Sequence, residues 1–398
     1  MADVGERDWG LDYFLILIVV ALLLIGLMMV YSSSFPLAYN LYGESTYYLI
    51  RQGVWVGMGL VIMALMTRIE YHKWRKFSII LMLATLFLLV AVLLWGEETH
   101  GAKRWLLQGS IQPSEVCKLV TVLYIAHWLS SKGEKLKQVT YGFVPFAILI
   151  GTIAGLIILE PDFGTAILVV AVTGGMFFIA GADLIQLVIS STVGGGTFLL
   201  LIANSEYAWR RVLTFLQDPF NSPLAEETYQ IIQTLVALGT GGITGVGLGS
   251  GQQKLAFLPS AHSDAIFAVL GEELGLIGCL TVVSLFATLA YRGFKIALRA
   301  EDPFGFILAS GITSLLAFQA LINIAAVTAS LPFTGLPLPF ISFGGSSLVI
   351  SMMGVGMLLS ISRGTREKTE ERNAPFSFRR RHGRARVSHS SRRRAVEK

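Results

Sequence analysis

Charge is scarce in this chain of 398 residues. Only 14% of the residues are Asp, Glu, Lys or Arg, and 54% are hydrophobic. Soluble domains carry about 25% charged residues. The mean hydropathy of +0.65 points the same way. This composition excludes an ordinary soluble domain and predicts a protein that lives in a lipid bilayer.

Several common signals are also missing. The two cysteines, Cys117 and Cys279, lie inside apolar runs without metal-type spacing, so we interpret them as small buried hydrophobic residues and expect no disulfide framework. Residues 11–33 form too long an apolar run for a signal peptide, which predicts a retained helix. The glycines of 239–251 follow no strand and lack a GK[ST] ending. We interpret them as flexible backbone that approaches lipid or a ligand closely.

Long hydrophobic runs are abundant. A bilayer-spanning helix needs roughly 20 apolar residues. The sequence therefore predicts an all-α polytopic membrane protein with about ten transmembrane helices. We place them at residues 11–33, 46–67, 77–95, 113–130, 142–160, 163–181, 183–203, 265–290, 304–328 and 346–362.

Lysine and arginine are unevenly distributed among the connections. They concentrate at 68–76, 132–137 and 292–299, whereas 34–45 and 329–345 contain none. Because basic loops stay on the cytoplasmic side, we expect these three connections in the cytoplasm. With ten spans, both termini are then cytoplasmic, in the cell membrane of a bacterium.

We divide the chain into a membrane domain, 1–362, and a basic, disordered cytoplasmic tail, 363–398. The tail either binds anionic lipid or serves as a positive-inside anchor; without aromatic interleaving or a folded module, we expect no nucleic acid as a partner. Residues 204–264 form a large extracytoplasmic loop between helices 7 and 8. Loops longer than about 15 residues are usually functional. Within it, Trp209–Phe220 has interfacial character, and Leu224–Leu238 predicts a further helix.

A polar cluster, His262-Ser263-Asp264, stands where this loop turns into an apolar helix. A carboxylate at a membrane boundary usually marks a site. Asp264 suits general-base work on a hydroxyl, or an N-cap, and the two roles can coexist. Glu272 and Glu273 fall about 80° and 180° around the helix from Asp264, so the three cannot share one pocket. We expect these two glutamates to hold helices together.

A second group of charges lies in QPSEVCK and EPDFGT. Glu115 and Lys118 are three residues apart and share a helix face, which predicts an ion pair. Pro161 ends one helix, and Asp162 caps the next. These residues form either a structural network or a polar cavity for a charged headgroup or a cation, because carboxylate oxygens suit Mg²⁺ or Mn²⁺. The sequence leaves both open.

The connection LPFTGLPLPFISFGGSS, at 331–347, contains three prolines. It predicts a rigid, re-entrant, non-helical segment. Its apolar surface and hydroxyls, including Ser342 and Ser346, suit a cavity for a lipid-linked polar substrate.

Five motifs in order resemble the SEDS family (shape, elongation, division and sporulation proteins). They are QPSEVCKL at 112–119, EPDFGTA at 160–166, the segments 229–254 and 258–278, and LPFTGLPLPFISFGGSS at 331–347. SAHSD and GEELGLIG look more like the division branch, FtsW, than the elongation branch, RodA. Phe343 stands where the family usually has tyrosine, a loss of one hydroxyl that should not touch the chemistry.

The resemblance implies a peptidoglycan glycosyltransferase that polymerises lipid II, a disaccharide-pentapeptide on undecaprenyl pyrophosphate, during cell division. The family's catalytic aspartate corresponds to Asp264, and its other polar positions correspond to Glu115, Lys118 and Asp162. A divalent cation, Mg²⁺ or Mn²⁺, is implied, with Asp264 or Glu115 as its ligand. The implied partners are a class B penicillin-binding protein (an FtsI-like transpeptidase), other division proteins and membrane lipids.

Basic side chains are needed to balance the pyrophosphate leaving group. The candidates include Lys254 and the neighbouring Arg210 and Arg211. His262 is expected to orient the loop. Two other functions remain open. One is a lipid II flippase, although no inverted repeat is visible; the other is a division scaffold without catalysis.

Overall fold

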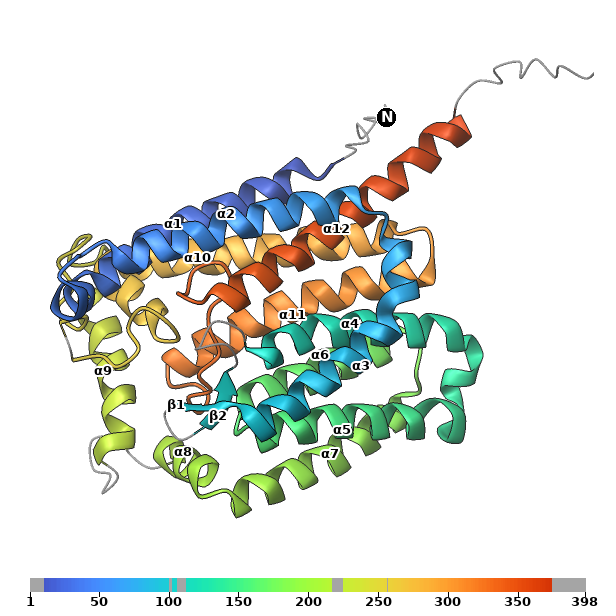
Figure 1. The fold of residues 1–398 in the computed structure, drawn as a ribbon, viewed down its shortest axis with the longest axis horizontal. Coiled ribbons are helices and arrows are strands. Elements are labelled where there is room, and N and C mark those ends of the chain that lie inside the picture. The colour runs from blue at the N-terminus through green and yellow to red at the C-terminus, as the bar shows by residue number, and fades with distance from the viewer. Residues whose placement is uncertain (1–10, 100–101, 106–111, 217–224, 256, 374–398) are drawn as a thin grey trace, which may run out of the picture.

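The computed structural model describes residues 11–99, 102–105, 112–216, 225–255 and 257–373. A helix stands at each of the ten predicted places, so the chain is an all-α polytopic membrane protein (Figure 1). The bounds of these helices are α1 Tyr13–Tyr42, α2 Tyr47–Arg68, α3 Tyr71–Trp95, α4 Pro113–Lys132, α5 Val144–Leu159, α6 Phe163–Ile179, α7 Leu184–Asn204, α10 Ile266–Arg299, α11 Pro303–Val327 and α12 Gly345–Asn373.

The large loop contains structure of its own. Within 204–264, the helices α8 (Glu206–Leu216) and α9 (Ala225–Gly241) lie close to the two places that the sequence indicated. A short antiparallel hairpin, β1 (Glu97–Thr99) with β2 (Ala102–Trp105), follows α3 and was not predicted. A 3-10 turn at Gly133–Lys137 and a π-helical turn at Val139–Phe143 join α4 to α5.

Seven helices of the described part are long and apolar enough to cross a bilayer. They are α1, α2, α3, α10, α11, the apolar part of α12, and α5 taken together with the turn before it. By these criteria α6 is short, at 17 residues. The exact count of ten spans stays a prediction.

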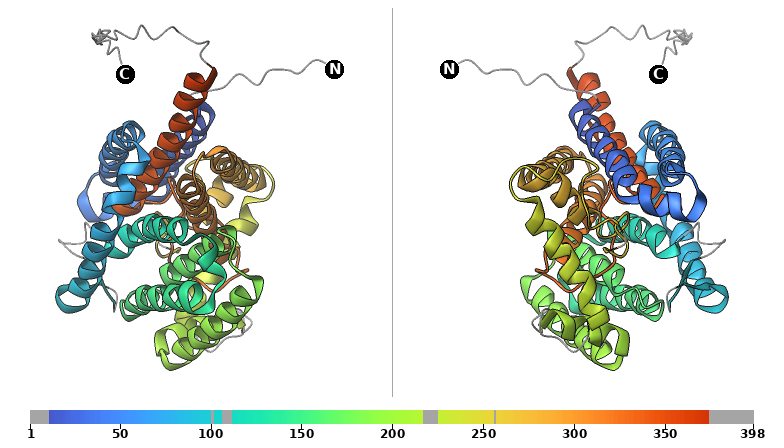
Figure 2. Two further views of the ribbon diagram at one scale, coloured as in Figure 1. Left: turned by 90° about the vertical axis from the view of Figure 1, so that its right-hand side faces the viewer. Right: turned by 90° about the vertical axis from the view of Figure 1, so that its left-hand side faces the viewer.

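The bundle is arranged around α11. In its most apolar window 72% of the residues are buried, against 22% for α2, so α11 is central and α2 faces outward. Helix α12 packs along α2, α10 along α11, and α3 along α4 (Figures 1 and 2). Loops that meet the end of α11 are therefore held by the most enclosed of these seven helices.

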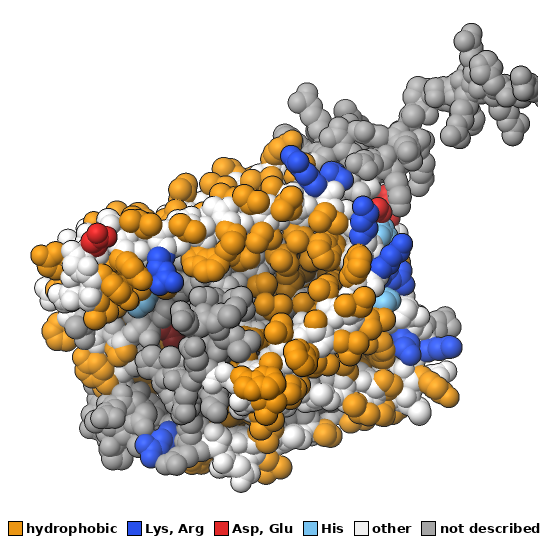
Figure 3. Space-filling view, viewed as in Figure 1, with side chains coloured by type: hydrophobic (Ala, Val, Ile, Leu, Met, Phe, Trp, Pro, Cys, Tyr) orange, Lys and Arg blue, Asp and Glu red, His pale blue; other side chains and the backbone are white. Residues whose placement is uncertain are grey.

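The two ends of the bundle differ in charge. Helix α1 begins and α12 ends at the same end, where the α2–α3, α4–α5 and α10–α11 connections also lie (Figure 1). Lysine and arginine side chains gather at this end in the visible face, while hydrophobic side chains cover much of the space between the ends (Figure 3). The segments 242–255, 257–265 and 328–344 lie at the opposite end.

Two helices differ from the predicted bounds for local reasons. Helix α1 continues past the serines to Tyr42, with Pro36 inside it. The hydroxyls of Ser33 and Ser34 donate back to the Val30 carbonyl, so both polar groups are satisfied within the helix itself. Helix α10 is interrupted at Gly275, where φ is 65° and ψ is −164°. Only glycine adopts this backbone conformation readily.

The predicted boundary between domain and tail is not sharp. Helix α12 continues beyond residue 362 to Asn373. Residues 374–398, most of the predicted disordered tail, lie outside the described residues, and the division at 362 stays a prediction.

Candidate active site

Asp264 stands directly before α10 and is half-buried. The N-cap of α10 is Ala265, one residue later, so Asp264 is not the N-cap residue. Its Oδ1 accepts a hydrogen bond of 3.0 Å from the Ser263 hydroxyl. Its Oδ2 faces Gly335, since a Cβ on that glycine would lie 3.7 Å away. The carboxylate thus stands between the start of α10 and the 328–344 segment.

The segment carrying Asp264 is bonded to the 328–344 segment at successive residues. The Phe343 amide donates to the His262 carbonyl at 2.9 Å. The Ser342 hydroxyl donates to the Ser263 carbonyl at 2.6 Å and accepts from the Leu338 amide at 2.8 Å. These bonds fix two non-helical segments against each other. The 328–344 segment, which contains most of the predicted re-entrant segment 331–347, therefore forms one wall beside Asp264.

An asparagine that the sequence analysis did not single out completes this arrangement. The Asn323 side-chain amide, on α11, donates to the Asp264 carbonyl at 2.8 Å and to the Leu336 carbonyl at 2.7 Å. One turn earlier, the Gln319 amide donates to the Pro337 carbonyl at 2.9 Å. Two amides four residues apart therefore bind consecutive carbonyls of the re-entrant segment. The signal was present as two side-chain amides, four residues apart, in the apolar run 304–328.

Burial dominates the electrostatics of Asp264. Loss of solvent raises the pKa of this carboxyl above its usual value, although the Ser263 hydroxyl, nearby backbone amides and the Arg211 guanidinium act in the opposite direction. Burial lowers the pKa of His262, whose ring lies 4.9 Å from that of Tyr48 and 5.6 Å from that of Phe343. At neutral pH this histidine is a neutral ring packed among aromatics.

Arg211 approaches this site, whereas Arg210 lies on the exposed face of α8. The Arg211 guanidinium donates to the Phe333 carbonyl at 2.9 Å, and its charge acts on Asp264. The Arg210 side chain is exposed. The Arg211 side chain is thus attached to the re-entrant segment.

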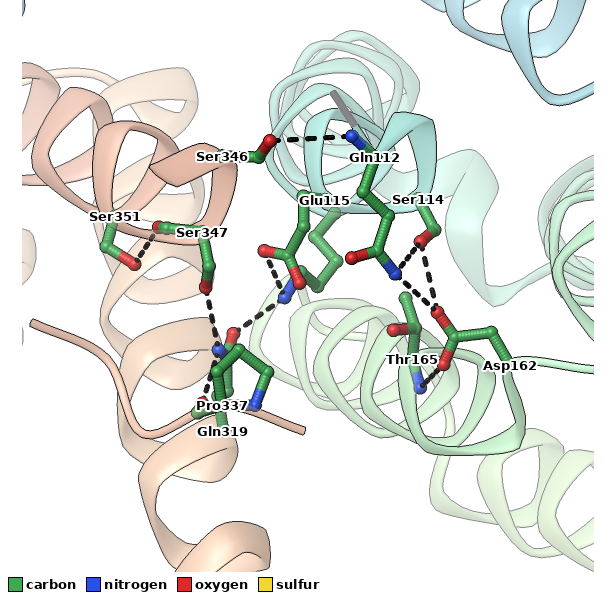
Figure 4. Close-up of polar contacts among 11 residues, drawn as sticks. Gln112, Ser114, Glu115, Asp162, Thr165, Gln319, Pro337, Ser346, Ser347 and Ser351 are labelled. Carbon is green, nitrogen blue, oxygen red and sulfur yellow. Dashed lines mark hydrogen bonds and ion pairs between the residues drawn. The ribbon is translucent and has the colours of Figure 1, made fainter. Parts of the chain in front are cut away.

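The Glu115–Lys118 pair forms as the spacing predicted. The Lys118 ammonium lies 2.7 Å from the Glu115 carboxylate, and both side chains are buried. Lys118 also donates to the Gln319 side chain at 2.9 Å, and Gln319 donates to the Ser347 hydroxyl at 3.4 Å. Figure 4 shows this chain of contacts running from α4 to α11 and α12. The ion pair is thus linked through Gln319 to the re-entrant segment.

Asp162 caps α6, as predicted, and reaches back to α4. Its Oδ1 accepts from the Thr165 amide at 3.1 Å, and its Oδ2 accepts from the Ser114 hydroxyl at 3.0 Å (Figure 4). The Gln112 side chain donates to the same oxygen at 3.3 Å, and the Gln112 amide donates to Ser346 at 3.4 Å. The contacts tie α4, α6 and α12 together. Roles for Asp162 and Ser346 in binding substrate stay predictions.

A third buried network contains Lys254. Its ammonium lies 2.5 Å from the Glu273 carboxylate and 3.1 Å from the Ser32 hydroxyl, with both charged side chains almost fully enclosed. The Glu272 carboxylate accepts from the Gln252 amide at 2.7 Å. The two glutamates therefore hold α1, α10 and the 242–254 segment together. This agrees with the prediction that Glu272 and Glu273 hold helices together. A cavity role for Lys254 stays a prediction.

The glycine-rich stretch packs backbone against backbone. The Val246 and Gly247 amides donate to the Glu272 and Glu273 carbonyls at 3.0 and 3.1 Å. A Cβ on Gly245 would lie 2.1 Å from the Glu273 carbonyl oxygen. Close approach of backbone, which only glycine permits, accounts for Gly241 and Gly245. A positive φ, without such a close neighbour, is instead what is shared by Gly242, Gly247 and Gly249.

The residues that the structure describes contain no cluster of metal-ligating side chains. Nowhere among them do three or more His, Cys, Asp or Glu side chains gather in a way that would hold an ion. Glu115 is already paired with Lys118, and Asp264 stands as a single carboxylate. Such a set does not fit a resident cation site, although Mg²⁺ is commonly held by one or two carboxylates together with substrate phosphates.

Comparisons with known proteins agree with this architecture. A family model for cell cycle proteins, FtsW/RodA/SpoVE, matches residues 13–367. A protein of Geobacter sulfurreducens named "probable peptidoglycan glycosyltransferase FtsW" is 40% identical over 88% of this chain and 95% of its own length. Stage V sporulation protein E of Bacillus subtilis is also 40% identical, over 89% of this chain and 98% of its own.

Solved structures give the same picture. A chain from a peptidoglycan synthase complex, described as coordinating polymerization and crosslinking, matches with a TM-score of 0.71 and 28% identity, covering 90% of this chain and 100% of that one. The Rod shape determining protein RodA of Thermus thermophilus matches with a TM-score of 0.66 and 26% identity, covering 90% and 99% of the two chains. The chain belongs to the FtsW/RodA/SpoVE family of cell cycle proteins.

Proposed function

We propose that this protein is a peptidoglycan glycosyltransferase that polymerises lipid II during cell division, with Asp264 as the general base. The observation that carries the proposal is the placement of Asp264. It is a half-buried carboxylate fixed between α10 and the re-entrant segment, with its pKa raised by burial. A base is most effective when its pKa lies close to the working pH, so a raised pKa favours this role.

The chemistry follows from this placement. The C4 hydroxyl of one sugar attacks the anomeric carbon of a lipid-linked sugar, and the carbon–oxygen bond to the pyrophosphate breaks. The hydroxyl proton passes to Asp264, and undecaprenyl pyrophosphate leaves with the bonding electrons. The Ser263 hydroxyl donates to Oδ1, and we assign the proton to Oδ2, which lies on the Gly335 side. Asn323 holds the residue in place through its backbone.

The leaving pyrophosphate needs positive charge. Arg211 is the best-placed basic side chain, because it contacts the re-entrant segment and its charge acts on Asp264. A divalent cation would enter bound to the pyrophosphate, because the described side chains do not by themselves fit a resident cation site. No step above depends on that cation.

The names of the relatives support this function and its division role, since the Geobacter protein is called a glycosyltransferase and FtsW. The match to a chain of a synthase complex supports a transpeptidase partner of the class B penicillin-binding type. The basic end of the bundle supports cytoplasmic termini. Asp264, at the other end, then works at the outer face of the cell membrane.

The function is tested with purified full-length protein, alone and with its transpeptidase, incubated with lipid II and analysed for glycan products on a gel. The proposal expects polymers from the wild type. A parallel assay follows lipid II translocation in liposomes. Translocation without polymer in every condition would replace this proposal by the flippase. Absence of both polymerisation and translocation would favour the scaffold.

A further inference from the structure

An aromatic cluster joins the α1–α2 connection to the segment that carries Asp264. Gly43 ends α1 with a positive φ of 74°, which turns the chain so that Tyr42 meets Tyr47 at the start of α2. Their rings are stacked, with centroids 3.8 Å apart and planes inclined by 16°. The Tyr48 ring stands edge-on to Tyr47, with centroids 5.4 Å apart.

The cluster continues without a break to the candidate active site. The Tyr48 ring lies 4.9 Å from His262 and 5.1 Å from Phe343, centroid to centroid. His262 is two residues from Asp264. One turn along the same face of α2, the Gln52 side chain donates to the Ser342 carbonyl at 3.2 Å. Helix α2 is therefore fastened to the re-entrant segment, which fixes the tyrosines relative to the proposed base.

The outer part of the cluster is open and carries a charge. Tyr42 is 50% exposed, and Arg51 is exposed as well. The Arg51 guanidinium donates to the Tyr47 hydroxyl at 3.0 Å and lies 5.6 Å from the centre of that ring. The surface offers flat ring faces beside phenol hydroxyls and a guanidinium group.

This combination suits a pyranose ring. The C–H face of a sugar packs on an aromatic ring, while its hydroxyls bond to phenol and guanidinium groups. Tyrosines also gather at membrane interfaces merely as anchors. An anchoring role, however, requires neither a stacked pair held by an arginine nor a connection to the residues around Asp264.

We propose that Tyr42, Tyr47 and Arg51 form a saccharide subsite that holds pyranose rings of the glycan strand next to Asp264. The proposal rests on the proposed function for the identity of the sugar polymer. Holding the strand between additions would raise the number of sugars added before release. Substitutions in the subsite should therefore shorten the polymer.

The direct test measures binding and needs no turnover. Full-length protein carrying Asp264→Asn, in detergent micelles, is titrated with an uncrosslinked tetrasaccharide of alternating N-acetylglucosamine and N-acetylmuramic acid, and saturation transfer to the sugar protons is recorded. We expect the added pair Tyr42→Ala and Tyr47→Ala to weaken binding by roughly tenfold. The pair Tyr42→Phe and Tyr47→Phe keeps the rings and should retain most of the affinity.

Tyr39 supplies a matched control. It lies one turn before Tyr42 on α1, is 65% exposed, and makes none of the ring contacts of the cluster. Tyr39→Ala should leave tetrasaccharide binding unchanged. The subsite would be overturned if the tetrasaccharide bound equally well with both tyrosines present and with both replaced by alanine. It would also be overturned if Tyr39→Ala weakened binding as much as the double substitution. Because the free tetrasaccharide carries no pyrophosphate leaving group and cannot be polymerised, the outcome is separate from whether Asp264 is the base.

Discussion

Asn323 holds Asp264 by its backbone and not by its carboxylate. The amide donates at 2.8 Å to the Asp264 carbonyl and at 2.7 Å to the Leu336 carbonyl, from a side chain that is 2% exposed. The most buried helix thereby fixes both walls of the site and leaves the carboxylate itself to the chemistry. Gln319, one turn away, extends the same support to the Glu115–Lys118 pair.

Asn323→Ala should therefore lower catalysis far more than substrate binding. The substitution removes both hydrogen bonds and frees Asp264 to shift. Because small displacements of a catalytic group are costly, we expect kcat for lipid II polymerisation to fall on the order of a hundredfold. Initial rates over a range of lipid II concentrations separate kcat from KM.

The matched control is Asn204→Ala. The Asn204 amide donates only to Leu200 of its own helix, at 2.7 Å, and is exposed. Its loss should leave the rate within twofold or so of the wild type, the scale of a surface change. A rate for Asn323→Ala equal to that control would remove Asn323 from the positioning of Asp264.

The pH dependence of the rate should show the raised pKa of Asp264. The base works only when ionised, so activity is lost as pH falls through its pKa in the folded protein. Because burial raises that pKa above the ordinary 3.8, the acid limb of the kcat/KM profile should lie at a higher pH than a solvent-exposed aspartate would give. An acid limb at or below the ordinary value would contradict this assignment.

The raised pKa of Asp264 should also appear in the folding stability of the protein. A raised pKa in the folded state means that ionisation of Asp264 opposes folding, and this cost appears as pH rises through the folded-state pKa. Asp264→Asn should then melt at the same temperature as the wild type or higher at neutral pH, and the difference should narrow in acid. Thermal unfolding followed by intrinsic fluorescence measures it. A much lower melting temperature would indicate a structural role.

The Glu115–Lys118 pair provides a test of the buried network. Lys118→Met leaves the Glu115 carboxylate buried without its partner, and such losses cost about 3–5 kcal/mol. Adding Glu115→Gln should restore much of the stability, because the uncompensated charge is gone. A double-mutant cycle on unfolding free energies gives the coupling. Additive effects would show that the two charges do not stabilise each other.

Gly275→Ala should disrupt the packing of α10 against the glycine-rich stretch. A Cβ there would lie 2.3 Å from the Gly245 amide nitrogen, and the backbone conformation alone costs on the order of 1–3 kcal/mol for other residues. We expect a clear loss of thermal stability. Gly195→Ala, in α7 with nothing within 4 Å of the new methyl group, is the control and should be neutral or stabilising. Equal melting temperatures for the two variants would exclude the close approach.

Local patterns account for what the sequence predicted well. Helix places follow from apolar runs, the Glu115–Lys118 pair from a spacing of three, and the Asp162 cap from its place after Pro161. Each depends on residues close together in the chain. The sequence also predicted that Glu273 holds helices together. It did not predict its partner Ser32, which lies 241 residues away in the chain.

The features that escaped prediction depend on long-range contacts. Asn323 meets Asp264 across 59 residues, and nothing in the run 304–328 shows which carbonyl its amide will reach. The break at Gly275 depends on the backbone of residues 243–247 lying against α10. Helix α1, which runs past residue 33 to Tyr42, meets distant parts of the chain, since the Ser32 hydroxyl donates to the Glu273 carboxylate and the Lys254 ammonium lies 5.1 Å from the centre of the Phe35 ring.

The most direct measurement is the yield of glycan polymer from lipid II by Asp264→Asn, compared with the wild type and with Ser263→Ala at equal protein concentration. Asparagine keeps the shape and the Ser263 contact but cannot accept a proton. We predict no polymer from Asp264→Asn, with a folded protein, and polymer at a reduced rate from Ser263→Ala. Polymer of normal yield and length from Asp264→Asn would contradict the assignment of Asp264 as the base.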